Sequence, residues 1–294
     1  MKPTSNKNFS SRSPLSLLLV GALLPLAAQA HMTWLLPNAA QVSGKEPVVT
    51  VDAAISEDLF VFERALKLET LRITGPAGVN VEPDNRSAAR HRESFDLKLV
   101  KDGTYRISHT SQSVLASYQQ GGETKRFRGT PEAFAKEVPA QVELLGLART
   151  FNRHQTFVSK EEPGTLSFSP EGQGMELIPL GPVTDLSDGD NTRFRLLLDG
   201  KPLPDATLRL LREGNRYRYK MGEVTVKSDA KGEFGITWAE PGRYWLGANH
   251  GERPTNPAPA ASATAGMPTG MAGGTRDKPL QRASLSATFE VRPK

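Results

Sequence analysis

Short apolar runs separated by turn residues recur along most of this chain and leave little room for long helices. Apolar and polar residues alternate in segments such as Val48–Ala54 and Ser94–Leu99, which is typical of strands with one buried face. Turn signals such as Gly75-Pro76 and Asp199-Gly200 stand between the runs. We therefore expect an all-β protein built from two β-sandwich domains.

One segment departs from the β pattern near residue 130. Thr130 can cap a helix, Pro131 suits its first position and Glu132 is an acid in its first turn. Phe134 follows at helical spacing, but the proline at position 139 should end or kink the helix. We expect a short helical insertion between strands of the first domain.

A turn is predicted at Lys101-Asp102-Gly103, between the runs Ser94–Leu99 and Thr104–Ser108. Two strands joined through a glycine turn indicate a β-hairpin. The sequence Asp102-Gly103-Thr104-Tyr105 also resembles the turn and tyrosine that close corners in Greek-key sandwiches.

Residues 1–30 have the sequence features of a secretory signal peptide. Three basic residues without an acid precede an apolar run from Leu15 to Leu26, and Ala28-Gln29-Ala30 supplies a small-x-small cleavage site. Cleavage after Ala30 would make His31 the first residue of the mature chain. We expect a periplasmic protein.

The amino-acid composition argues against several kinds of site and partner. Without any cysteine the chain has no disulfides, thiolate metal sites or Cys nucleophiles. The leader's three cations account for part of the formal charge of +5, so the mature chain carries only +2. Neither a basic stripe with aromatics nor a second long apolar run is present, so neither nucleic acid nor stable membrane insertion is expected.

The mature chain divides where its composition changes. We expect an N-terminal sandwich at residues 31–170, which holds the helical insertion, and a C-terminal sandwich at residues 171–294. Residues 251–280 are rich in Pro, Ala, Gly, Thr and Met, which predicts a low-complexity loop inside the second domain.

A terminal His31 would offer an α-amino nitrogen and an imidazole nitrogen on one residue. Together these can chelate Ni²⁺, Cu²⁺ or Zn²⁺, with an affinity that falls below about pH 6 as both groups are protonated. The competing interpretation is an ordinary residue, because the position after a cleavage site is weakly constrained. For a second ligand we favour His109 or His154, which are predicted in the same domain; His91 lies between two arginines and His250 opens the loop.

Motifs of the common enzyme classes are missing from the sequence. It has no Gly-x-Ser-x-Gly elbow, no Walker loop and no His-Glu-x-x-His zinc helix. We therefore do not expect an enzyme.

Five segments carry a resemblance to a known family, and they occur in a consistent order: His31–Pro37, Gly172–Leu180, Phe194–Leu203, Ser228–Phe234 and Pro241–Leu246. They resemble the exported DUF4198 family, whose members are often described as periplasmic components of nickel or cobalt uptake. The resemblance implies a transthyretin-like or Ig-like second sandwich. It also implies nickel or cobalt as the bound metal and a membrane metal transporter as a partner.

Two alternatives come from other function classes. The first is a module that binds an outer-membrane receptor or another envelope partner and needs no metal. The second is a copper protein that uses a histidine brace, since a terminal amine with two imidazoles suits Cu²⁺ as well as Ni²⁺.

Overall fold

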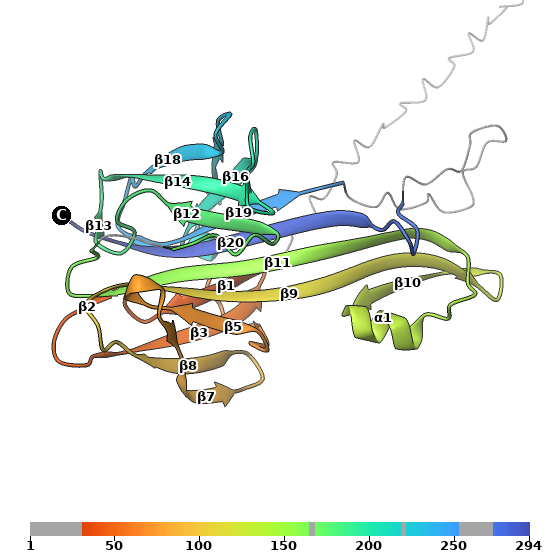
Figure 1. Cartoon of the computed structure of the whole chain (residues 1–294), viewed down its shortest axis with the longest axis horizontal. Helices are drawn as coiled ribbons and strands as arrows, with labels where there is room; N and C mark the ends of the chain where they lie inside the picture. The colour runs from red at the N-terminus through yellow and green to blue at the C-terminus, as the bar shows by residue number, and fades with distance from the viewer. Residues whose placement is uncertain (1–30, 165–167, 219–221, 253–272) are drawn as a thin grey trace, which may run out of the picture. The chain divides into compact units, whose positions relative to one another are not determined.

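Three β-sheets make up the part of the chain that the computed structural model describes, which is residues 31–164, 168–218, 222–252 and 273–294 (Figure 1). The prediction of an all-β sandwich fold with a short helix is confirmed. The predicted leader, residues 1–30, and most of the predicted loop 251–280 lie outside the described residues.

The largest sheet has eleven strands and runs through the middle of the fold. Its main path is β17 (Val224–Lys227), β16 (Thr207–Arg212), β19 (Gly242–His250), β20 (Leu280–Arg292), β11 (Leu144–Lys160), β9 (Gly103–Gln120), β5 (Leu71–Thr74) and β6 (Asn80–Val81). Three further strands pair at its borders: β10 (Glu123–Gly129), β13 (Leu186–Ser187) and β2 (Gln41–Val42). We call it the central sheet.

A smaller sheet covers each face of the central sheet. The N-terminal sheet consists of β1 (Met32–Pro37), β3 (Val48–Ser56), β8 (Glu93–Lys98), β7 (Asp84–Ala88) and β4 (Arg64–Ala65). The C-terminal sheet consists of β12 (Met175–Pro179), β14 (Asn191–Leu198), β15 (Lys201–Pro202) and β18 (Glu233–Thr237).

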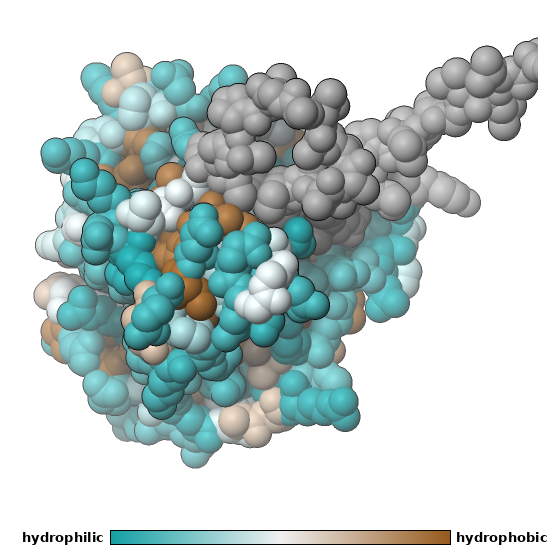
Figure 2. Space-filling model, turned by 90° about the vertical axis from the view of Figure 1, so that its right-hand side faces the viewer, coloured by the Kyte–Doolittle hydropathy of each residue, from teal (hydrophilic) through white to brown (hydrophobic). Residues whose placement is uncertain are grey.

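Alternation along the central strands produces two hydrophobic cores. Because successive strand residues point to opposite faces, Phe157 of β11 packs against the C-terminal sheet and Val158 against the N-terminal sheet. Tyr105 and Ile107 of β9 join Val158 in the N-terminal core. Phe289 of β20 joins Phe157 in the C-terminal core. Figure 2 shows that hydrophilic residues cover most of the described surface on one side, with apolar residues in small groups between them.

The predicted boundary near residue 170 falls between β11 and β12. All buried residues of the N-terminal core precede it, and those of the C-terminal core follow it except for Phe157 of β11. The two parts nevertheless share the central sheet, because β11 pairs in parallel with β20 from Ala148↔Leu280 to Thr156↔Thr288. Residues 31–294 form one compact unit.

The turn after residue 100 crosses between sheets. The predicted hairpin is wrong, since β8 pairs with β3 and β7 while β9 pairs with β5, β10 and β11. The resemblance to a tyrosine corner is confirmed: the Tyr105 hydroxyl donates to the carbonyl oxygen of Lys101 at 2.8 Å and accepts from its amide nitrogen at 2.9 Å. A corner moves the chain to the opposite sheet, where a hairpin would return it to the same one.

The predicted helical insertion is confirmed as α1 (Pro131–Glu137). The Thr130 hydroxyl accepts a hydrogen bond from the amide nitrogen of Ala133 at 3.2 Å, and the helix ends before Pro139. With seven residues, α1 is far shorter than a bilayer is thick, and no helix of the described segments has the length and apolarity to cross one.

Candidate functional site

Two of the predicted site residues, His109 and His154, lie side by side in the central sheet. They stand directly opposite each other on β9 and β11, and their rings stack with centroids 6.0 Å apart and planes 17° from parallel. Both side chains are buried. They share the strand face of Ile107 and Val158, so they point toward the N-terminal sheet.

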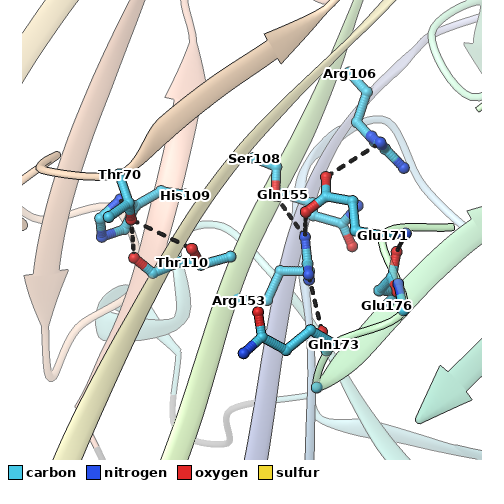
Figure 3. A network of polar contacts seen from close by, with 12 residues as sticks. Thr70, Arg106, Ser108, His109, Thr110, Arg153, Gln155, Glu171, Gln173 and Glu176 are labelled. Atoms are coloured by element: carbon cyan, nitrogen blue, oxygen red, sulfur yellow. Dashed lines mark hydrogen bonds and ion pairs between the residues drawn. The ribbon is translucent and has the colours of Figure 1, made fainter. Parts of the chain in front are cut away.

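Hydroxyl groups hold the Nδ1 atom of each ring. Ser286 Oγ lies 2.8 Å from His154 Nδ1, and the same hydroxyl donates to the carbonyl oxygen of Thr33 at 2.7 Å. A hydroxyl has a single proton, so Ser286 must accept from Nδ1–H of His154. Thr70 contacts His109 Nδ1 at 3.4 Å and donates to the carbonyl of Thr110 in the same way (Figure 3).

These contacts favour the tautomer with the proton on Nδ1 and a lone pair on Nε2, more strongly for His154, whose contact is the shorter one. His109 Nε2 is buried and has no hydrogen-bond partner among the described residues. A histidine whose Nδ1–H is held by an oxygen and whose Nε2 carries a free lone pair is prepared to bind a metal.

Burial also keeps both rings neutral. It lowers the pKa of His109 to about 4, with a smaller contribution from the charge of Arg86. Burial likewise lowers the pKa of His154 to about 3, helped by the neighbouring His109. Both imidazoles are therefore in the metal-binding protonation state at neutral pH.

The third predicted ligand, His31, lies at the start of β1 and is half-exposed. Its Nε2 atom lies 3.5 Å from Oε1 of Glu57, so its imidazole faces a carboxylate on the surface and not the histidine pair. Its chain nitrogen belongs to a peptide bond unless residues 1–30 are removed. In the described part of the chain no group of three or more His, Asp or Glu side chains is arranged to hold a metal.

The structure nevertheless connects the start of β1 to the pair. The carbonyl oxygen of Thr33 accepts from both Ser286 Oγ and Trp245 Nε1, the latter at 3.0 Å. Thr33 is therefore joined to His154 through a single hydroxyl. The two histidines that the sequence did not favour as ligands lie elsewhere. His91 is exposed and donates to the carbonyl of Glu63, and His250 is exposed at the end of β19.

Sequence reasoning missed Thr70 and Ser286, which orient the rings, and a buried ionic network on the opposite face of the central sheet. In that network Glu171 binds Arg153 at 2.7 Å and Arg106 at 3.2 Å (Figure 3). The available signal was alternation, because Arg106 stands between Tyr105 and Ile107 and so must occupy the other face of β9.

Comparison with protein families identifies the family of this chain. A family described as "Domain of unknown function (DUF4198)" matches residues 28–252, which confirms the resemblance drawn from the five segments. No protein with a curated description matches the chain.

Solved structures show only a distant likeness. An α2-macroglobulin variant from Salmonella is 12% identical with a TM-score of 0.24, over 87% of this chain and 14% of that one. A DUF4785 family protein from Legionella pneumophila is 9% identical with a TM-score of 0.23, over 73% of this chain and 50% of that one. The chain thus spans half or less of the length of either protein, and scores this low support no functional argument.

Proposed function

The chain belongs to the DUF4198 family, and on that premise we propose that it is an exported, periplasmic protein that binds a divalent transition metal and supports its uptake. Nickel or cobalt is the first choice and copper the second. The metal is cargo, held by Nε2 of His109 and His154. After removal of residues 1–30, the amine and imidazole of His31 complete the site.

The observation that carries this proposal is the paired, neutral imidazoles with both Nδ1 protons committed to hydroxyl groups. A buried nitrogen lone pair without a donor is unfavourable in the empty protein, and a metal ion supplies the missing partner. Imidazole nitrogen suits nickel, cobalt, copper and zinc, so the donor set favours this class of ion over calcium or magnesium.

The position of β1 supports His31 as the further ligand. Thr33 is tied to Ser286, and two residues of extended chain span at most about 7 Å, so His31 begins within reach of the pair. Its imidazole must then leave Glu57, a contact that is half-exposed and therefore weak. A site with two internal ligands and one terminal residue is easily opened, which suits transfer to a membrane transporter.

Calorimetry on a mass-verified chain that begins at His31 tests the proposal. We expect saturable heat with Ni²⁺ or Co²⁺ at one site. Replacing His154 with Asn removes a ligand and should abolish that heat. Ser286→Ala should weaken binding by about tenfold or more, because nothing would then hold the proton of His154 on Nδ1 and leave Nε2 free for the metal. His91→Ala is the matched control, since it removes an exposed histidine far from the pair in sequence.

A chain that keeps one extra residue before His31 separates the roles of the terminus and the pair. It should bind more weakly, and its affinity should change less between about pH 5 and pH 7, because burial keeps His109 and His154 neutral over that range. Absence of heat with Ni²⁺, Co²⁺ and Cu²⁺ on the correctly processed chain would refute metal binding. Tightest binding of Cu²⁺, with oxygen consumption in the presence of a reductant, would indicate the copper alternative.

A further inference from the structure

A surface pocket lies on the face of the central sheet opposite the histidine pair. Its floor is built from β5, β6 and β9, where Thr74 pairs with Arg106 on one side and Asn80 on the other. Arg72 stands on the same face of β5, and the chain at Ser169 and Glu171 forms the wall. The pocket has a volume of about 270 Å³.

Arg106 is the buried charge in this pocket. Only 4% of its side chain is exposed, and its guanidinium lies over the Phe168 ring at 5.1 Å. One nitrogen, Nη2, binds Glu171. Its Nε and Nη1 atoms are buried and have no partner among the residues that the structure describes. A buried guanidinium with two unused donors is unfavourable unless something in the pocket accepts from it.

The nearby carboxylates are already committed. Glu171 also binds Arg153 at 2.7 Å, and although burial alone would raise its pKa, the hydrogen bond and charge of Arg153 together with Arg106 hold that pKa below its usual value. Glu176 is buried and accepts from the amide nitrogens of Glu171 and Gly172, each at 2.7 Å. Both carboxylates are thus engaged within the fold.

The charges do not balance. Arg72, Arg106 and Arg153 carry three positive charges, whereas Glu171 and Glu176 carry two negative ones. An anion with one negative charge would neutralise the cluster and accept from the free donors of Arg106. The hydroxyl and amide groups of Thr74, Asn80 and Ser169 add neutral hydrogen-bonding groups to the lining.

We propose that this pocket is a binding site for a small organic carboxylate, held by Arg106 at its base and Arg72 at its mouth. The volume lies below the range of about 300–1,000 Å³ that is typical for drug-sized ligands, which favours a small molecule. The single unmatched charge favours a carboxylate over a phosphate ester, which carries nearly two. The site is independent of the histidine pair.

Calorimetry with the chain from His31 to Lys294 tests this site, with sodium propionate, a carboxylate with one negative charge, as the probe and ionic strength held constant with sodium chloride. We expect saturable binding with a Kd of about 1 mM or tighter. Arg72→Gln should weaken it by about tenfold, because a charge-assisted hydrogen bond is lost at an exposed position that the fold does not need. Arg128→Gln on β10, an exposed arginine outside the pocket, should bind as the unchanged chain does.

A second variant and two further probes make the result decisive. Arg106→Lys keeps a charge beside Glu171 but removes the planar donors, so it should weaken propionate binding while the melting temperature shows that the chain still folds. Propionamide, which has no charge, should not bind. Absence of saturable heat with propionate, binding by both the Arg72 and Arg106 variants as tight as by the unchanged chain, or tighter binding of inorganic phosphate would each overturn the proposal.

Discussion

At the scale of single residues, protonation of His109 and His154 makes the stability of the metal-free protein depend on pH. In the folded state their pKa values lie near 4 and 3, whereas an unfolded histidine titrates near 6.5. Between these values the unfolded chain binds protons that the folded chain does not. The free energy of unfolding should therefore fall as the pH drops below about 6.5, and His109 alone accounts for about 3 kcal/mol by pH 4.

Urea unfolding with a chelator present, at neutral pH and near pH 4.5, measures this effect. Carboxylates also lose stabilising contacts in acid, so the comparison that matters is with a variant. His109→Gln should lose less stability than the unchanged chain over this interval, and His91→Ala should lose the same amount. Equal acid losses in His109→Gln and the unchanged chain would show that folding does not lower the pKa of His109.

The candidate site could be predicted in part. Imidazole chemistry and a predicted position in the same domain as His31 singled out His109 and His154. Their pairing depends on the register between β9 and β11, which is set by packing of distant segments and leaves no local signal. The same holds for Thr70 and Ser286, since an isolated Thr or Ser in a sequence gives no sign of the ring that it orients.

At the scale of elements, α1 gives a clean test because its start rests on a single side chain. Thr130→Ala removes the acceptor for the amide nitrogen of Ala133 and should lower the free energy of unfolding by about 1 kcal/mol. Thr130→Ser keeps the hydroxyl and should stay close to the original value. The helix is packed through Phe134, whose ring lies 5.5 Å from that of Phe127, so the loss should appear in global urea unfolding. An unchanged midpoint for Thr130→Ala would mean that α1 unfolds before the rest.

The positions of the helix and the strands were easier to predict than the pairing between strands. Local signals identified α1, because cap, proline and helical spacing all lie within a few residues. Alternation likewise located β8 and β9, yet the same local evidence gave the wrong pairing. Tyr105 decides the geometry there, because its hydroxyl holds the backbone of Lys101 and turns the chain toward another sheet.

At the scale of the whole molecule, the central sheet ties the two sequence halves together. β20 comes from the end of the chain and pairs with β11 over nine residue positions. A third buried cluster joins Met32 and Trp34 of β1 to Leu211 of β16 and Trp245 of β19. Sequence composition placed a boundary near residue 170, and it could not reveal these contacts because they link segments far apart in the chain.

This arrangement leads us to expect one cooperative unfolding transition for residues 31–294. A fragment of residues 31–170 would lack β20, so β11 would expose a strand edge and the face that carries Phe157. It should therefore fail to give the dispersed amide spectrum of a folded domain. In the complete chain, Trp34 and Trp238 are buried on the N-terminal and C-terminal sides. Variants in which Trp245 and one of these two are replaced by Phe keep a single tryptophan that reports one side by fluorescence. We expect the urea midpoints of the two sides to coincide, because both cores pack on the same central strands and one core cannot unfold while the other stays folded. Separate midpoints, with a folded 31–170 fragment, would show instead two domains that fold independently on either side of residue 170.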